Sequence, residues 1–177
     1  MSDFIAPKHS GKTDYIGAFA VSAGFKQEDL VKKYEAEDDQ YNVMLVKTLT
    51  DRLAEAFAEQ IHLEIRKEIW GYAPDEDMCL ADIHAMKYQG IRPAAGYPTQ
   101  PDHTEKTTMW DLMKVTEETG IEMTEGLALY PTSSTAGLYF ANPHSYYFNV
   151  DEICKDQVES YAKRKGMSTA EAEKWLA

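Results

Sequence analysis

The segment Gly90–Pro98 combines residue types that are suited to holding a ligand. It contains one arginine, two prolines and two glycines within nine residues. Proline fixes φ and removes a backbone donor, while glycine lets the chain come close to a bound molecule. The planar guanidinium of Arg92 suits a carboxylate or a phosphate. The pattern is also typical of an ordered turn whose arginine forms a surface ion pair, so the loop composition leaves both interpretations open.

A second set of charged residues recurs at every fourth position from residue 47 to residue 59. Lys47, Asp51, Glu55 and Glu59 lie on one face if this segment is helical, because residues four apart are neighbours on a helix. The three carboxylates repel one another unless a cation sits beside them. The row predicts either a solvated acidic face or an acidic wall that recognises an ammonium group.

No set of residues in the sequence has the spacing of a familiar catalytic or metal site. There is no Gly-x-Ser-x-Gly elbow, the five histidines include no His-x-x-x-His pair, and Cys79 and Cys154 have no second cysteine nearby. We therefore predict no catalytic residue and no metal site. What remains is a binding set, with Arg92 for a carboxylate, Glu55 for an ammonium group, and the loop with Tyr147 for flat or apolar surface. An α-amino acid carries that pair of opposite charges.

The bulk composition indicates one soluble globular domain. The 177 residues are 44% hydrophobic and 27% charged, and the net charge is −12. The negative charge argues against a nucleic-acid surface and against docking on an anionic membrane. The sequence does not start with a basic segment followed by an apolar run, and no apolar stretch is long enough to span a bilayer. Together with the low cysteine count, these features predict a cytoplasmic, reduced location.

Hydrophobic periodicity predicts the elements that must position these residues. We expect a buried strand at 15–21, inside a sheet because it is apolar on both faces, and a polar helix near 27–36. A long helix at about 39–70 follows. Its apolar residues recur at every fourth position and are Leu45, Leu49, Leu53, Phe57, Ile61, Ile65 and Ile69. Because a row of fours winds around a 3.6-residue helix, different parts of the helix must be held from different sides, as in a central helix laid across a sheet.

Capping signals predict shorter helices in the second half of the chain. One helix is expected at about 75–88, and another begins at Asp102, which forms a capping box with Glu105, and stops at Gly120. Two C-terminal helices are expected at about 151–165 and from Ser168 onward.

The stretch 121–150 is rich in aromatic residues and contains no lysine or arginine. Turn residues at 131–137 and 142–145 separate its apolar runs. The pattern predicts a meander of two or three antiparallel strands, in which the hydroxyl of Tyr147 needs a partner if it is buried.

These motifs resemble a known family. The pattern Arg92-Pro93-x-x-Gly96-Tyr97-Pro98, followed by Pro101-x-His103-Thr104-Glu105-Lys106, resembles the S-adenosylmethionine-binding loop of the activation domain of cobalamin-dependent methionine synthase. Other segments that resemble the family are Asp3–Pro7, Asp14–Gly17, Asp51–Glu59, Lys155–Glu159 and Arg164–Ser168. The family loop usually has proline where Ala95 stands here, and this replacement should loosen the turn.

The resemblance implies a fold and a role. The implied fold is α+β, with a long central helix and shorter helices around a twisted antiparallel sheet. The implied role is S-adenosylmethionine-dependent reductive methylation of cob(II)alamin, as part of a methyltransferase that makes methionine. Cobalamin would be presented by the cobalamin-binding domain, and the electron would come from flavodoxin or a related reductase. Zinc would belong only to the homocysteine domain, which is absent from this sequence.

The resemblance also assigns residues to the binding of S-adenosylmethionine. Arg92 is expected to bind the methionyl carboxylate and Glu55 to face the amino group. Ala94, Ala95, Gly96 and Tyr97 are expected to line the ligand through their backbone. Tyr147 and Phe148 are expected to close the pocket.

The resemblance further implies that residues 1–177 are the C-terminal portion of the activation domain. An upstream part would contribute further strands and an aspartate to the site, so this chain alone is expected to be catalytically incomplete. Two other interpretations remain open. One is a stand-alone, non-catalytic S-adenosylmethionine-binding module with a regulatory or structural role, and the other is a remnant that binds nothing.

Overall fold

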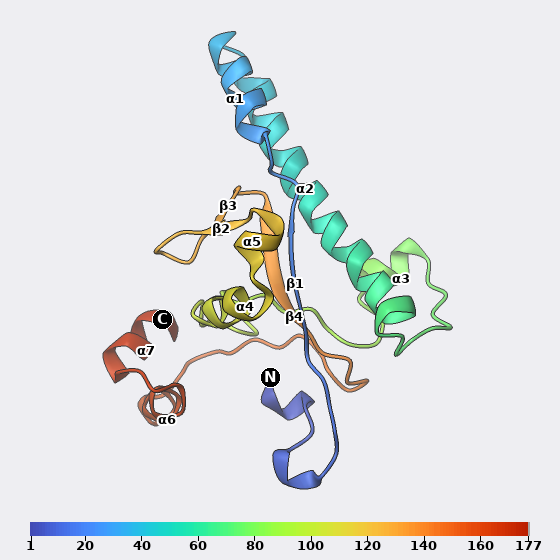
Figure 1. The fold of residues 1–177 in the computed structure, drawn as a ribbon, viewed down its shortest axis with the longest axis vertical. Helices are drawn as coiled ribbons and strands as arrows, with labels where there is room; N and C mark the ends of the chain where they lie inside the picture. Colours follow the sequence, from blue (N-terminus) through green and yellow to red (C-terminus); the bar gives the residue numbers. More distant parts are fainter. Residues whose placement is uncertain (177) are drawn as a thin grey trace.

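The computed structural model describes residues 1–176 and has the expected α+β class, with a long helix beside small antiparallel sheets (Figure 1). The helices are α1 (Gln27–Ala36), α2 (Gln40–Glu64), α3 (Leu80–His84), α4 (Glu105–Met113), α5 (Val115–Thr119), α6 (Lys155–Lys165) and α7 (Thr169–Leu176). The strands are β1 (Gly17–Ser22), β2 (Glu122–Met123), β3 (Leu129–Tyr130) and β4 (Ser134–Tyr139). Short turns form η1 (Ser2–Phe4) and η2 (Lys8–Ser10), and a π-helical turn, η3 (Ile65–Ile69), extends α2.

The central sheet joins β1 to β4 in antiparallel register, with Gly17 opposite Tyr139 and Ser22 opposite Ser134. Beyond β4, the chain at Ile91 forms an isolated antiparallel bridge to Phe140. Within residues 1–176, β1 pairs with β4 alone, so the expectation that this strand lies inside a sheet is wrong for the described chain. Both faces of the strand are nevertheless packed, since Phe19 and Val21 belong to one apolar cluster, and Ala18 and Ala20 pack against another.

Helix α2 packs on the sheet through small residues. Asp39 accepts a hydrogen bond from the backbone N–H of Asn42 and caps the helix, close to the predicted start. Ala54 and Ala58 are buried, and Ala58 packs in the core with Phe19 and other residues of β1 and β4. Small side chains allow the helix backbone to approach the strands closely.

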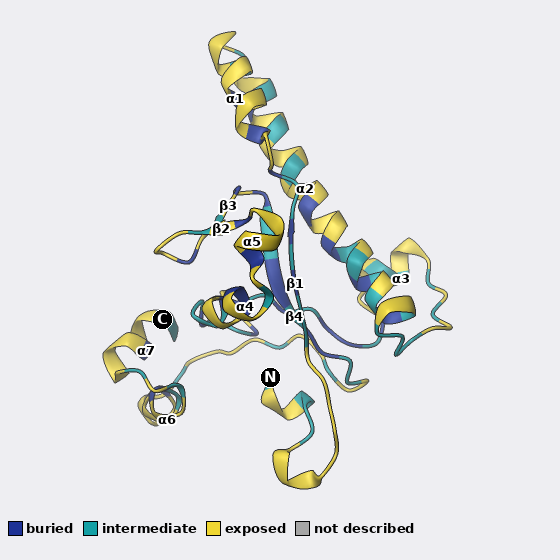
Figure 2. Ribbon diagram, viewed as in Figure 1, coloured by how far each residue is buried: buried dark blue, intermediate teal, exposed yellow. Residues whose placement is uncertain are grey.

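The apolar row predicted to anchor α2 is largely exposed instead (Figure 2). Its exposed members are Leu45, Leu49, Leu53, Phe57 and Ile69. The buried row is Ala54, Ala58, His62 and Arg66, which also steps by four. The expectation that the leucine row is held from different sides is therefore wrong within the described chain, because the neighbouring row makes the contact with the sheet.

The predicted meander is only partly correct. Strands β2 and β3 form an antiparallel pair, but β4 begins inside the stretch 131–137 that was expected to separate two strands. It pairs with β1 rather than with a sequence neighbour. No strand is assigned at 146–150, where the chain is held by single contacts such as the hydrogen bond from Val150 N to Pro98 O.

Two predicted helix starts are also wrong. The helix expected at 75–88 is limited to α3, and Thr104 rather than Asp102 precedes α4. The carboxylate of Asp102 accepts hydrogen bonds from Thr104 and from Lys165 of α6, so it joins two parts of the chain instead of capping a helix. Gly166, in the left-handed region at φ 75°, ends α6 as predicted.

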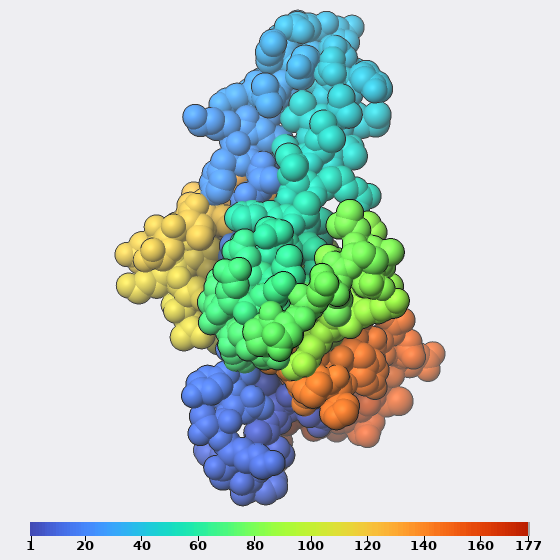
Figure 3. Space-filling view, turned by 90° about the vertical axis from the view of Figure 1, so that its right-hand side faces the viewer, coloured from blue at the N-terminus to red at the C-terminus, as the bar shows by residue number. Residues whose placement is uncertain are grey.

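The molecule is elongated. The pair formed by α1 and the first half of α2 projects beyond the rest of the chain (Figure 3). Among residues 1–176, no helix combines the length and the apolar character needed to cross a bilayer.

Candidate ligand-binding site

A cleft of 570 Å³ lies where α2, the central sheet and the loop 90–98 meet. Several of its walls come from parts of the chain that are distant in sequence. Among the predicted site residues, those that line the cleft are Glu55, Arg92, Ala94, Tyr97 and Tyr147. The structure therefore brings together one arginine, one predicted acidic partner and two tyrosines.

Three predicted site residues lie outside the lining of this cleft. Ala95 is buried, and Gly96 lies against the imidazole of His103. The ring of Phe148 packs edge-on against Phe4 and Tyr146.

Main-chain hydrogen bonds fix both ends of the loop. The carbonyl of Pro93 accepts from the N–H of Leu138 on β4 at 2.9 Å, and the carbonyl of Pro98 accepts from Val150 at 2.9 Å. The loop is thus tied to the sheet at one end and to the 146–150 segment at the other. Arg92 lies between the contact at Pro93 and the bridge from Ile91 to Phe140, so its backbone position is well defined.

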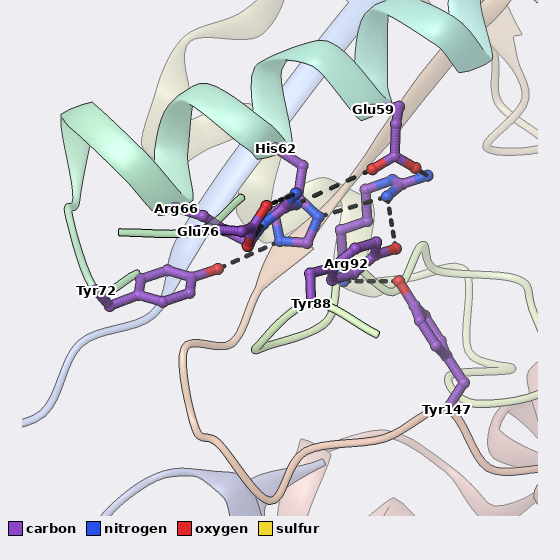
Figure 4. A network of polar contacts seen from close by, with 8 residues as sticks. All are labelled: Glu59, His62, Arg66, Tyr72, Glu76, Tyr88, Arg92 and Tyr147. Carbon is purple, nitrogen blue, oxygen red and sulfur yellow. Dashed lines mark hydrogen bonds and ion pairs between the residues drawn. The ribbon is translucent and has the colours of Figure 1, made fainter. Parts of the chain in front are cut away.

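Arg92 is surrounded by four protein groups (Figure 4). Its Nη2 lies 2.8 Å from a carboxylate oxygen of Glu59, and its Nη1 donates to the hydroxyl of Tyr88 at 3.0 Å. Nη1 also lies 3.4 Å from Nδ1 of His62. The backbone N–H of Arg92 donates to the hydroxyl of Tyr147 at 2.9 Å, which supplies the partner that this tyrosine was expected to need. With only 17% of its side chain exposed, Arg92 forms a mostly buried ion pair rather than a surface one.

A second arginine lies deeper. The side chain of Arg66 is fully buried, donates to both oxygens of Glu76, and has its guanidinium 4.2 Å from the centre of the Tyr88 ring. The charges of the two arginines are matched by two glutamates, Glu59 and Glu76. The site is therefore built from two adjoining ion pairs that share Tyr88 as a spacer.

The uncharged members of this cluster have strongly shifted pKa values. Burial, reinforced by the two nearby arginines, lowers the pKa of His62 to about 2. Burial raises the pKa of both Tyr72 and Tyr88 to about 12. At neutral pH these three groups are uncharged and act as hydrogen-bonding spacers between the ion pairs.

The predicted acidic row occupies three different environments. Asp51 accepts a hydrogen bond from Ser133 at 2.6 Å, and Glu59 pairs with Arg92. Glu55 lines the main cleft and also an adjoining polar cleft of 410 Å³ that is rich in hydroxyl groups. The row is therefore not a simply solvated helical face, since two of its three carboxylates bind other parts of the protein.

The sequence pattern missed the residues beneath Arg92. Glu59 belongs to the row of fours, but the sequence analysis assigns the functional role to Glu55. Arg66 and Glu76 gave no local signal, because each is one charged residue among many. Only the folded chain shows that they meet.

Together, the fold and the cleft define an α+β domain with a charge-paired binding site. The chain belongs to the family described as vitamin B12 dependent methionine synthase, activation domain, whose sequence model matches residues 1–166. It is also similar to a crystal structure of the MetH reactivation domain bound to AdoHcy, with 53% sequence identity and a TM-score of 0.95. That similarity covers 99% of this chain, which spans 54% of the other.

Proposed function

We propose that this chain is the S-adenosylmethionine-binding reactivation module of a cobalamin-dependent methionine synthase. The observation that carries the proposal is its 53% identity to the AdoHcy-bound reactivation domain, combined with a cleft that contains the predicted arginine, acidic residue and tyrosines. Its role is to support the reductive methylation of cob(II)alamin in methionine biosynthesis.

In this proposal, Arg92 binds the methionyl carboxylate. A guanidinium recognises a carboxylate with charge and with paired donors, and the surroundings of Arg92 hold it in place before the ligand arrives. The backbone at Ala94–Tyr97 forms the wall next to it. Tyr97 and Tyr147 cover the apolar part of the ligand, while the ring of Phe148 packs against Phe4 and Tyr146.

The proposed chemistry requires the protein to position the ligand rather than to act as an acid or a base. The methyl group of a sulfonium is already activated, and reduced cobalamin, when bound by its own domain, supplies the nucleophile. The residues of this chain have to hold the sulfonium in a fixed orientation and keep its methyl group accessible. Met86, Tyr97 and Tyr147 are partly exposed at the cleft and offer an apolar rim to a docking domain.

The partners in this proposal are the cobalamin-binding domain and an electron donor, flavodoxin or a related reductase. Turnover then requires those partners, so the chain by itself does not complete the reaction. Zinc has no role in this part of the enzyme. We place the protein in the cytoplasm, where the reductase operates.

We also propose that residues 1–177 are the C-terminal portion of a larger activation domain. The exposed row on α2, which includes Leu49, Leu53 and Phe57, is a large apolar surface for a protein of this size. Strand β1 has a free edge within the described residues. A further segment that adds a strand to β1 and an apolar face to α2 would cover both.

Calorimetric titration of the natural full-length protein with S-adenosylmethionine and S-adenosylhomocysteine tests the binding role. Arg92→Ala should weaken binding by about 2–4 kcal/mol, as expected when one partner of a buried charged contact is removed. Arg164→Ala, on the exposed face of α6, is the matched control and should bind like the wild type. Equal affinities for the Arg92 variant and the wild type would refute the assignment.

A further inference from the structure

We infer that helix α7 positions the ligand-binding loop 90–98 through two aromatic side chains, Trp175 and His103. Trp175 holds the imidazole of His103 against Gly96, so both act as positioning residues, although neither lines the cleft. The inference rests on the proposed function, since it takes the loop as the part of the chain that binds S-adenosylmethionine. It gives the C-terminal helices a role in ligand binding.

The first observation is the contact between His103 and the loop. Gly96 has a φ of 95°, and it faces the imidazole so closely that a Cβ would overlap the ring atoms Cε1 and Nε2. Two backbone hydrogen bonds of 2.8 Å close the turn at this point, from Gly96 to Gln100 and from Gln100 to Tyr97. Tyr97 lines the cleft. The imidazole therefore supports a turn that forms part of the cleft wall.

Lys106 fixes one edge of this imidazole. Its buried ammonium group lies 3.0 Å from Nδ1 of His103 and donates to the carbonyl of Leu127 at 2.9 Å. An ammonium group can only donate, so Nδ1 accepts and the proton of the neutral ring is on Nε2. Burial and the charge of Lys106 lower the pKa of His103, which favours this neutral form. The ring thus has one tautomer and one anchored edge.

The contacts of α6 and α7 with the rest of the chain converge on the residues around His103. Lys165 of α6 pairs with Asp102 and Glu105, which flank the histidine in the sequence. Trp175 of α7 lies beside its ring, with the ring centroids 6.1 Å apart. Every side-chain hydrogen bond, ion pair and aromatic contact that joins these helices to residues 1–150 falls on the segment 102–105.

Helices α6 and α7 otherwise pack on each other. Their apolar cluster consists of Val158, Ala162 and Ala172, with Ile153, Tyr161, Met167 and Leu176 at its edge. Figure 1 shows the pair at the margin of the molecule, beyond α4. Because the pair has its own core and a small contact with the rest of the chain, it can open or close as one unit. Its closed position reaches the loop through His103.

The test measures the loop and the ligand separately in the natural full-length protein. Hydrogen exchange of residues 95–100 reports on the loop, and calorimetry gives the affinity for S-adenosylhomocysteine. Trp175→Ala should speed exchange in the loop and weaken binding about threefold to tenfold, the range expected for one aromatic pair. Trp175→Phe keeps an aromatic ring and should restore most of both effects. Glu173→Ala, on the exposed face of α7, should resemble the wild type.

A double-substitution cycle shows whether Trp175 acts through His103. His103→Ala alone should weaken binding about as much as Trp175→Ala. In the His103→Ala background, Trp175→Ala should change the affinity by less than about twofold, because the side chain that transmits the contact is already gone. A merely structural role of Trp175 would lower the affinity by the same factor in both backgrounds.

Three results would overturn the inference while the proposed function stands. They are wild-type exchange and affinity in Trp175→Ala, equal losses of affinity with and without His103, and faster exchange in β1 and β4 of Trp175→Ala, which would indicate general loosening. A wild-type protein that does not bind S-adenosylhomocysteine would overturn the proposed function, and the exchange of residues 95–100 would then decide whether α7 holds the loop.

Discussion

Arg66 and Glu76 are joined by two parallel hydrogen bonds of 2.8 Å, from Nε and Nη2 of the arginine to the two carboxylate oxygens. The side chains are 0% and 3% exposed, so the pair is almost completely removed from water. It ties the segment after α2 to the interior, next to Tyr88, whose hydroxyl accepts a hydrogen bond from Arg92. The buried pair is therefore a structural support for the binding site.

We predict that Glu76→Gln destabilises the protein by about 3–5 kcal/mol. Removal of one charge from a buried pair leaves the other uncompensated in a low-dielectric environment. Equilibrium unfolding in urea measures the loss. Glu159→Gln, which breaks an exposed pair with Lys155 on α6, should change the free energy of unfolding by less than about 1 kcal/mol. Comparable effects in the two variants would contradict the role of the buried pair.

Stability should also fall as the pH drops below the ordinary pKa of histidine. His62 has a pKa of 6.5 in the unfolded chain and about 2 in the folded protein, because burial and the two arginines oppose its protonation. Between these values the unfolded state binds more protons, so acid favours unfolding. From pH 7.5 to pH 5, the free energy of unfolding should decrease by about 2 kcal/mol through this group alone.

The contribution of His62 can be separated from that of other groups by substitution. Urea unfolding of the wild type and of His62→Gln across this pH range should give curves that converge as the pH falls. His103, whose pKa is lowered mainly by burial, adds a slope of the same sign to both proteins. A stability difference that stays constant between pH 7.5 and pH 5 would show that folding does not change the pKa of His62, and would contradict the prediction.

The sequence was most informative where local interactions decide the structure. The start of α2 near Asp39, the end of α6 at Gly166 and the strand near Gly17–Ser22 were all expected from capping or periodicity. Strand β4 was not, because its turn-like residues become extended only by pairing with β1, more than one hundred residues earlier. No local pattern contains that pairing.

The face of α2 that packs on the sheet was not predicted, for a similar reason. Two rows on this helix step by four residues, and hydrophobicity favoured the row with Leu49 and Leu53 over the one with Ala54 and Ala58. The alanines are buried because they permit a closer approach to the sheet. In the site, charge type drew attention to Arg92, which lines the cleft, but which glutamate it meets depends on where the loop crosses the helix.

Gly96 should tolerate no side chain. Its φ is 95°, and a Cβ at this position would overlap the imidazole of His103. Gly96→Ala should therefore combine backbone strain of about 1–3 kcal/mol with a steric penalty of similar size. It should also weaken ligand binding, since the loop carries Arg92. Thermal and urea unfolding measure the first effect and calorimetry the second.

Gly166→Ala separates the two contributions to the Gly96 effect. Gly166 has a φ of 75°, but no heavy atom of residues 1–176 lies within 4 Å of the position that a Cβ would occupy, so its substitution introduces strain without a collision. It should cost about 1 kcal/mol, clearly less than Gly96→Ala. Adding His103→Ala to Gly96→Ala should recover the steric part only. If Gly96→Ala is no worse than Gly166→Ala, the contact with His103 does not constrain the loop.

Polar contacts of α6 dock the C-terminal helices on the rest of the chain. Lys165 of α6 lies 3.0 Å from Asp102 and 2.5 Å from Glu105, and Tyr161 donates a hydrogen bond to Asp102. Lys165→Met removes the cation but keeps the apolar stem. The amides of α6 and α7 should then exchange with solvent about tenfold faster, equivalent to about 1.4 kcal/mol, while those of β1 and β4 stay protected. Lys155→Met, at an exposed pair on the same helix, should leave exchange unchanged, and equal exchange in both variants would show that apolar contacts alone hold the helices in place.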